Sequence, residues 1–178
     1  MKKVRLIAVL FVGIMVLSCN QPSQKETDKT QLNAEAIQLM EQDIQKPDGT
    51  MDITKANKLL KKYDDIITRD KGNPLRAEYL FKAGNLAMNI NKPNVALRHF
   101  ENLLANYPKN PKAEQALFLR AFVLDNSLKE YEKAETAYKD FIKKYPRSEF
   151  ADDAKASLQY LGKSPEELIK EFEKKNKQ

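Results

Sequence analysis

A pattern of apolar residues and prolines recurs along the chain, and this repeat limits the possible folds more than any other feature. The pattern ends in a Tyr-Pro pair at Pro108 and again at Pro146, an offset of 38 residues. A weaker copy has an offset of 37 residues, as from Pro74 to Pro111. A recurring unit of this size cannot bury its apolar face alone, so it stacks on copies of itself. The recurring positions are Ala96, Phe100, Leu103, Leu104, Tyr107 and Pro108, then Ala134, Tyr138, Phe141, Ile142, Tyr145 and Pro146.

Within these units the apolar residues follow helical spacing, as at Ala56, Leu59, Leu60, Tyr63, Ile66 and Ile67. The many Lys, Glu, Ala and Leu residues lose little rotamer freedom in a helix. Because the connections between segments are short, neighbouring helices must pack antiparallel. We therefore predict an all-α chain of helical hairpins. The predicted helices span 30–46, 53–70, 74–90, 94–106, 111–126, 129–145, 148–161 and 164–175.

Several helix starts are marked by capping residues. Asn73, Asn110 and Ser164 each precede a proline, which predicts an N-cap followed by proline at the first helical position. Ser164 is also followed three residues later by Glu167, which is the spacing of a capping box. Ser148 is predicted to cap the helix at 148–161.

The repeated residues resemble the tetratricopeptide repeat (TPR), best in two units at 74–108 and 111–146. This resemblance implies a short superhelix of stacked hairpins, an α-solenoid. Phe122 stands where the pattern has Gly, and Asp125 where it has an aromatic residue. The offset also exceeds the usual 34 residues, and we expect the extra residues in the turns. The matching positions are Leu80, Ala83, Gly84, Ala87, Ala96, Phe100 and Pro108, then Phe118, Ala121, Ala134, Tyr138 and Pro146.

The amino terminus has the pattern of an export signal. Basic residues precede an apolar run over 6–17, which is shorter than the roughly 20 residues of a membrane-spanning helix. The run ends in Val-Leu, and Ser18 and then Cys19, the only cysteine of the chain, follow it. These residues resemble a lipobox, which implies a signal peptide at 1–18 and a diacylglycerol group on Cys19. An uncleaved anchor and an ordinary signal peptide with an incidental cysteine are the alternatives.

After Cys19 the sequence is polar and lacks apolar periodicity, which predicts a flexible tether over 19–29 and a helical domain over 30–178. A lipobox together with Tyr-Pro-terminated TPR units resembles the outer-membrane lipoproteins that support β-barrel protein assembly. It is also similar to the TPR half of the Tol-Pal-associated periplasmic protein. This resemblance implies a lipid-anchored protein of the bacterial cell envelope, on the periplasmic face of the outer membrane.

The residue inventory argues against catalysis. One His and one Cys cannot form a thiol protease pair if Cys19 carries lipid, and a histidine metal cluster is impossible. His99 is interpreted as a surface or helix-flank residue. Adjacent acids such as Asp152 and Asp153 point in different directions on a helix and cannot share a proton. We predict no catalytic residue, no cofactor and no metal site. Charges of both signs alternate along the helices, which makes nucleic acid an unlikely partner.

The TPR resemblance implies that the first helix of each hairpin lines a concave face that binds a protein. Phe81, Met88, Leu119 and Val123 would form an apolar strip there, suited to a peptide segment of an envelope protein. Alternatively, the first or last helix folds back over this strip. A further alternative is a structural lipoprotein that forms homo-oligomers through the helix at 30–46. The candidate binding residues are Glu78, Phe81, Asn85, Met88, Asn89, Ala116, Leu119, Val123 and Asn126.

Overall fold

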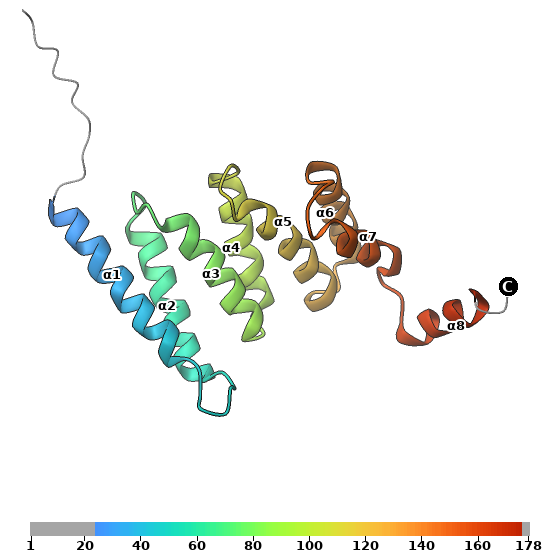
Figure 1. Ribbon diagram of the computed structural model, residues 1–178, viewed down its shortest axis with the longest axis horizontal. Coiled ribbons are helices and arrows are strands. Elements are labelled where there is room, and N and C mark those ends of the chain that lie inside the picture. Colours follow the sequence, from blue (N-terminus) through green and yellow to red (C-terminus); the bar gives the residue numbers. More distant parts are fainter. Residues whose placement is uncertain (1–23, 176–178) are drawn as a thin grey trace, which may run out of the picture.

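The computed structural model describes the backbone of residues 24–175. Within this range the chain forms helices and no strand (Figure 1), so the all-α prediction is confirmed. The predicted signal peptide at 1–18 and Cys19 lie outside the described residues. The helices are α1 (Gln24–Asp43), α2 (Ile53–Arg69), α3 (Arg76–Asn89), α4 (Pro93–Asn106), α5 (Ala113–Phe122) with the π-helix η1 (Val123–Ser127), α6 (Tyr131–Lys144), α7 (Ala151–Tyr160) and α8 (Pro165–Lys175).

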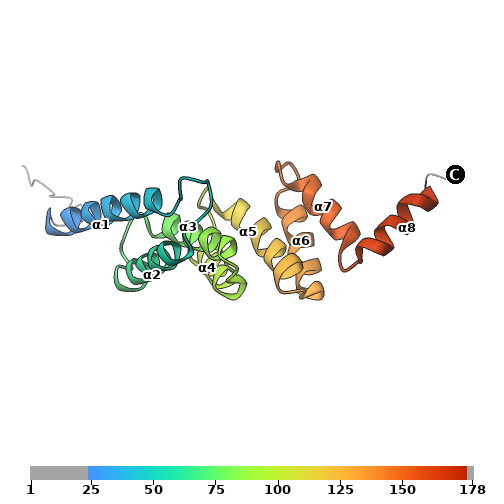
Figure 2. The ribbon, with the colours of Figure 1, turned by 90° about the horizontal axis from the view of Figure 1, so that it is seen from below.

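Consecutive helices pair into hairpins that stack along one direction. In Figure 2 the first helices of the hairpins, α1, α3, α5 and α7, lie toward one side of the stack, and α2, α4 and α6 lie toward the other. Each second helix also packs against the first helix of the next hairpin, as α2 does against α3 and α4 against α5. This is the α-solenoid arrangement predicted from the repeat. Helix α8 projects from the carboxyl-terminal end of the stack (Figure 1).

The first helix begins earlier than the sequence predicts. Its start at Gln24 lies within the predicted tether, and its end at Asp43 comes before the predicted boundary at 46. The segment 24–30 contains no Gly and no Pro, and its Lys, Glu and Gln residues are good helix formers even without an apolar face. Polar composition alone therefore does not separate tether from helix.

The Asn-Pro pairs shape the turns before the helices and do not cap them. Helix α3 begins at Arg76, and the Asn73 side chain instead accepts a hydrogen bond of 2.8 Å from the Leu75 N–H. Asn110 accepts an equivalent bond of 2.8 Å from Lys112, and α5 begins one residue later. Ser148 likewise does not cap α7. Its hydroxyl oxygen accepts a hydrogen bond of 3.2 Å from the Phe150 N–H, in the turn before this helix. These side chains close the turn that joins one hairpin to the next.

The capping box at α8 is confirmed. The Ser164 N–H donates to a Glu167 carboxylate oxygen at 2.8 Å, and the Glu167 N–H donates to Ser164 Oγ at 3.2 Å. Two backbone donors at the start of α8 are thus satisfied reciprocally.

The core of the described residues consists of two clusters. The larger cluster runs from α1 to α5 and includes Phe100, and the smaller one joins α5, α6 and α7 around Phe141. Helix α3 packs against α4 at Gly84, where an added Cβ would lie 2.5 Å from Phe100 Cε1. Only glycine fits there without displacing the ring, which explains this position of the repeat.

The extra residue of the second unit lies inside a helix. In the first unit, the Ile90 N–H bonds to the Leu86 carbonyl four residues back. At the corresponding place, the Leu128 N–H bonds to the Val123 carbonyl five residues back, at 3.0 Å. The offset between units is therefore 37 residues before η1 and 38 after it. The expectation that all extra residues lie in the turns is wrong for this one.

The aromatic contacts support this register. The ring centres of Phe81 and Phe100 are 6.3 Å apart, with an interplanar angle of 56°. The ring centres of Phe118 and Tyr138 are 6.2 Å apart, with the same angle. Phe118 thus corresponds to Phe81, with an offset of 37, while the partners on the second helix have an offset of 38. It follows that buried Ala121 takes the place of Gly84. Phe122, which the sequence pattern placed there, is 37% exposed and corresponds to Asn85.

The turn inside each of these two hairpins uses the left-handed backbone region. Asn91 has φ 57° and Lys129 has φ 58°, and the two positions correspond. Lysine adopts this conformation at a cost that glycine avoids. We expect Lys129→Gly to raise the free energy of unfolding by about 1 kcal/mol, measured by urea denaturation. Lys139→Gly, in the interior of α6, is the control and should lower it by about 1 kcal/mol. A loss of stability in Lys129→Gly would contradict this account.

Candidate functional site

The first helices of the hairpins share a stripe of accessible side chains, which we call the first-helix face. On α3 and α5 the stripe has the spacing i, i+4, i+7 and i+11, which keeps all four side chains on one side of a helix. Asn89, Phe122 and Asn126 are exposed and the others are half-buried. The face comprises Glu78, Lys82, Asn85 and Asn89 on α3, Gln115, Leu119, Phe122 and Asn126 on α5 and η1, and Ser157 and Tyr160 at the corresponding positions of α7.

Five of the nine residues predicted from the sequence lie in this face, namely Glu78, Asn85, Asn89, Leu119 and Asn126. Three others, Phe81, Ala116 and Val123, are buried, and Met88 is half-buried against the larger core cluster. The continuous apolar strip expected from the sequence is therefore not exposed. Whether these residues bind a partner stays a prediction.

Phe81 is covered from within the stack. Its ring packs against Phe100 of α4, and Lys112 Nζ lies 5.0 Å from its centre, in the turn before α5. Phe122 is the exposed aromatic residue of the face, although it stands where the sequence pattern has Gly.

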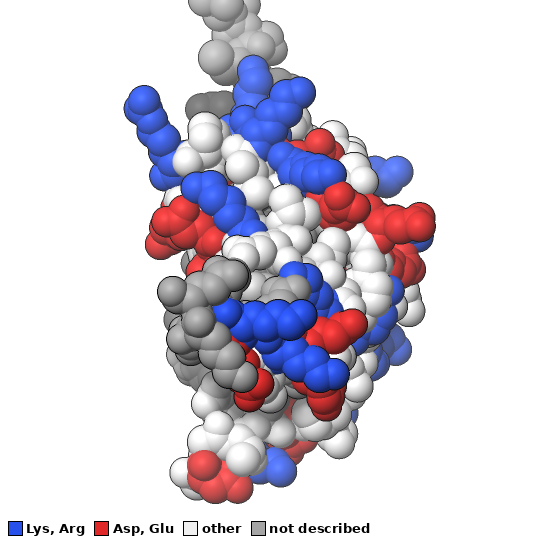
Figure 3. Space-filling model, turned by 90° about the vertical axis from the view of Figure 1, so that its right-hand side faces the viewer, with Lys and Arg blue, Asp and Glu red and all other residues white. Residues whose placement is uncertain are grey.

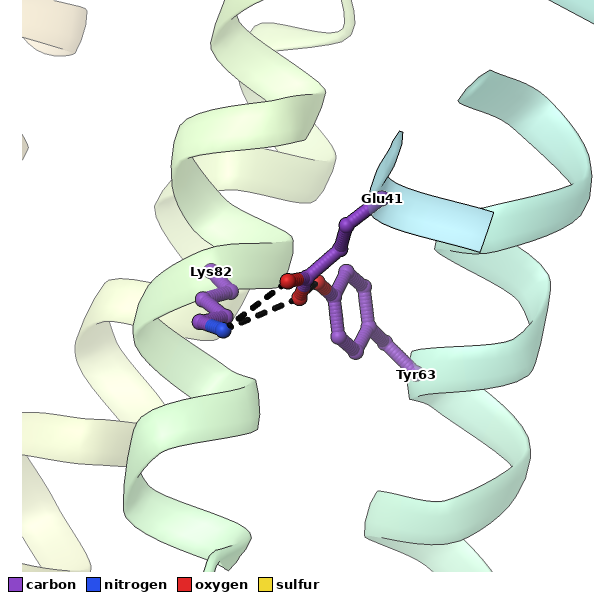
Figure 4. Close-up of polar contacts among 3 residues, drawn as sticks. All are labelled: Glu41, Tyr63 and Lys82. Carbon is purple, nitrogen blue, oxygen red and sulfur yellow. Dashed lines mark hydrogen bonds and ion pairs between the residues drawn. The ribbon is translucent and has the colours of Figure 1, made fainter. Parts of the chain in front are cut away.

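A three-residue polar cluster lies where α1 meets the first-helix face (Figure 4). Glu41 of α1 accepts hydrogen bonds from Lys82 Nζ at 3.0 and 3.2 Å and a further one from the Tyr63 hydroxyl of α2. Burial, together with the Glu41 carboxylate, raises the pKa of Tyr63, so its hydroxyl stays protonated and donates. The carboxylate thus joins three helices. Its partners are far apart in sequence, and no local pattern indicates them.

His99 is buried and not a surface residue as the sequence interpretation had it. Its side chain is 4% exposed, and Nε2 lies 3.2 Å from an Asp64 oxygen of α2. This contact does not have hydrogen-bond geometry. Burial lowers the pKa of His99, and the Asp64 carboxylate opposes that effect only in part. A signal was present, because Ala96, His99, Phe100 and Leu103 have the i, i+3, i+4, i+7 spacing of a buried helix face.

The lowered pKa of His99 predicts that acid destabilises the fold. The unfolded chain binds a proton at an ordinary pKa near 6.5, whereas folded His99 resists it, so stability falls as the pH drops through this region. We expect a smaller free energy of unfolding at about pH 5.5 than at about pH 7.5, measured by urea denaturation. His99 is the only histidine, so His99→Gln should remove most of the difference. If the free energy of unfolding changed equally with pH in both proteins, the effect could not be assigned to His99.

No group of three or more His, Cys, Asp or Glu side chains in the described part is placed to hold a metal ion. In the same part of the chain, no helix is long and apolar enough to cross a membrane.

The stacked hairpins, the glycine contact between α3 and α4, and the accessible face on the first helices define a TPR-type helical repeat protein. Residues 91–165 match the YfiO family, described as outer membrane lipoprotein. Over this part of the chain, the match confirms the resemblance to outer-membrane lipoproteins predicted from the sequence. The matched region spans α4 to the start of α8 and includes the exposed Phe122. No curated protein matches the chain.

Proposed function

We propose that this protein is a non-catalytic scaffold of the bacterial envelope that binds a segment of another envelope protein on its first-helix face. The observation that carries the proposal is the stripe of accessible amide and apolar side chains that continues from α3 to α7. Asn89 and Asn126 supply hydrogen-bonding groups, and Leu119 and Phe122 supply apolar area. Such a combination suits an extended or helical peptide, whose backbone needs hydrogen-bond partners.

The anchor of this scaffold is a lipid on Cys19, which holds the domain at the periplasmic face of the outer membrane. The lipobox pattern and the match to an outer membrane lipoprotein family both support it. An anchor raises the effective concentration of the face near its partner, which compensates for modest affinity.

Replacing the anchor residue tests the location. We expect Cys19→Ala to leave the helical fold unchanged by circular dichroism, while the protein moves from the membrane to the soluble fraction. Ser23→Ala, in the predicted tether, is the control, because it leaves the lipobox and its cysteine in place. Membrane association of Cys19→Ala equal to that of the wild type would refute the lipid anchor.

In-cell crosslinking tests the binding face. A photoreactive amino acid at position 89 or 126 should capture an envelope protein, and Leu119→Glu should reduce that capture at least fivefold. A photoreactive residue at position 139, exposed on the second helix α6, is the matched control and should capture little. Equal capture from position 139, or none from either face position, would count against the proposal.

Self-association through α1 is the second candidate, favoured by two exposed leucines. Leu32 is 66% and Leu39 is 67% exposed, and their separation of seven residues places them on one side of the helix. A stripe of this kind suits pairing with a second copy. Analytical ultracentrifugation should then give a dimer mass that Leu32→Ser combined with Leu39→Ser reduces to that of a monomer. A monomer mass for the wild type would exclude it.

A further inference from the structure

A hollow of about 410 Å³ lies at the carboxyl-terminal end of the first-helix face. Phe122 of α5, Tyr131 of α6 and Tyr160 of α7 line it, so three aromatic side chains from three helices meet there. We propose that this hollow binds an aromatic side chain of a peptide segment whose neighbouring residues are acidic. The proposal rests on the first-helix face being a binding surface, and it adds the chemistry of the ligand.

The hollow exposes apolar aromatic surface to solvent. Phe122 and Tyr131 are both exposed although they are large and hydrophobic. Gly162 also lines the hollow, and a Cβ added to it would lie 3.5 Å from the Tyr131 ring, an ordinary contact distance. The volume falls in the range of pockets that bind ligands. An aromatic ring entering the hollow would remove this apolar surface from water and stack against the rings already present.

Two unfavourable backbone features border the same hollow. The π-helix η1 follows Phe122 directly, and the left-handed residue Lys129 lies in the next turn. A π-helical turn is less stable than regular α-helix and is frequently found at functional sites. A non-glycine residue with positive φ also persists only where something else favours it. The first unit has a regular helix at the corresponding place, so the insertion sets the second unit apart.

The charge around the hollow favours an acidic ligand. Lys129 and Lys163 line it, and Lys163 Nζ lies 5.9 Å from the centre of the Tyr160 ring. Among the described lining residues the one acid is Asp125, which lies 3.5 Å from the Tyr138 hydroxyl. Burial raises the pKa of Asp125, and the Lys129 charge opposes that effect.

A smaller hollow next to it, of about 240 Å³, is lined by Lys163, Lys170, Lys174 and Glu167. The Glu167 carboxylate already accepts the N–H of Ser164. Figure 3 faces this end of the molecule and shows basic and acidic side chains around an uncharged area. Among the described residues that line the two hollows, the lysines outnumber the acids, and carboxylates flanking an aromatic residue would complement them.

A tryptophan-containing peptide provides a direct test, because the chain has no tryptophan of its own. The probe is the acetylated peptide Asp-Glu-Trp-Glu-Asp, titrated with the full chain in detergent micelles and followed by tryptophan fluorescence anisotropy. Empty micelles give the background. We expect saturable binding that weakens as salt is added. The peptide Lys-Lys-Trp-Lys-Lys should bind at least tenfold more weakly, and Asp-Glu-Ala-Glu-Asp should not compete.

Two substitutions of lining residues test whether the peptide binds in the hollow. Phe122→Ala should weaken binding of the acidic probe at least tenfold, and Lys129→Gly about threefold. Lys129→Gly is expected to stabilise the fold, so a weaker affinity cannot be attributed to unfolding. Leu75→Ala removes an apolar side chain of similar exposure, 38%, outside the hollow, and Asn91→Gly changes the corresponding turn of the first unit. Both controls should bind like the wild type.

Several results would overturn the proposal: no saturable binding, equal binding of the basic peptide, or unchanged affinity in Phe122→Ala and Lys129→Gly. A self-association of the chain that Phe122→Ala abolishes would also overturn it, because a second copy would then occupy the hollow.

Failure of this inference and failure of the proposed scaffold function can be distinguished. If crosslinking at position 89 captures an envelope protein but the probe does not bind, only the present inference is wrong. If the probe binds but no protein is captured, the scaffold role is wrong.

Discussion

Replacing Gly84 by alanine is expected to lower the free energy of unfolding by about 2 kcal/mol, even though alanine is the better helix former. The added Cβ would lie 2.5 Å from Cε1 and 2.8 Å from Cδ1 and Cζ of Phe100. Phe100 is fully buried, so its ring cannot move without displacing other core side chains. The strain of overpacking should therefore exceed the gain in helix propensity of about 1 kcal/mol. Urea denaturation followed by circular dichroism measures the change.

Two further variants test whether the loss of stability arises from the contact between position 84 and Phe100. Gly72→Ala is the matched control: an added Cβ there meets nothing within 4 Å, so stability should change by no more than about 0.5 kcal/mol. Phe100→Leu, which shortens the ring side chain, should cost less stability in the Gly84→Ala background than in the wild type. Additive losses from the two substitutions would show that Gly84 does not act through Phe100.

The helices were predictable because their signals are local. Apolar residues three and four positions apart, such as Leu59, Tyr63 and Ile66, mark the buried side of a helix without any knowledge of its neighbours. The stacking of hairpins followed from the repeat for a similar reason. The early start of α1 at Gln24 could not be predicted in this way, because the residues before 30 have no apolar periodicity.

The register of α5 was not predictable from the repeat alone. Ala121 lies 37 residues after Gly84 and 38 residues after Ala83, so either offset places a small residue at a buried position. The choice depends on where the backbone accommodates one extra residue, which is a property of the hydrogen bonds in η1. That choice moves Phe122 from the core to the first-helix face. The candidate site changed accordingly, because its accessible aromatic residue depends on this single shift.

Local sequence patterns likewise could not predict contacts between residues that are far apart in the sequence. Glu41, Tyr63 and Lys82 belong to three helices, and each alone looks like an ordinary residue of an amphipathic helix. Burial of His99 is a different case, since its spacing from Ala96 and Leu103 indicated the core side of α4. Polarity led to the wrong interpretation where periodicity would have led to the right one.

Phe118→Ala is expected to lower the free energy of unfolding by about 3 kcal/mol and to loosen mainly the carboxyl-terminal half of the stack. The Phe118 ring lies 5.6 Å from Phe141 of α6 and stacks at 5.1 Å on Phe150, which precedes α7. Its contact with Tyr138 adds a third aromatic pair. Removing this one side chain therefore weakens the packing of α5 against both following helices.

The location of the effect follows from the division of the core into two clusters. Each hairpin of a solenoid contacts only its neighbours, so damage to the smaller cluster need not unfold the larger one. Hydrogen exchange followed by mass spectrometry should show faster exchange in α5, α6 and α7 of Phe118→Ala, while α2 to α4 remain protected. Phe81→Ala, at the corresponding position of the first unit, should instead accelerate exchange in α3 and α4. Uniform acceleration along the whole chain in both variants would show that the stack unfolds as one cooperative unit, and the two clusters would then have no separate stability.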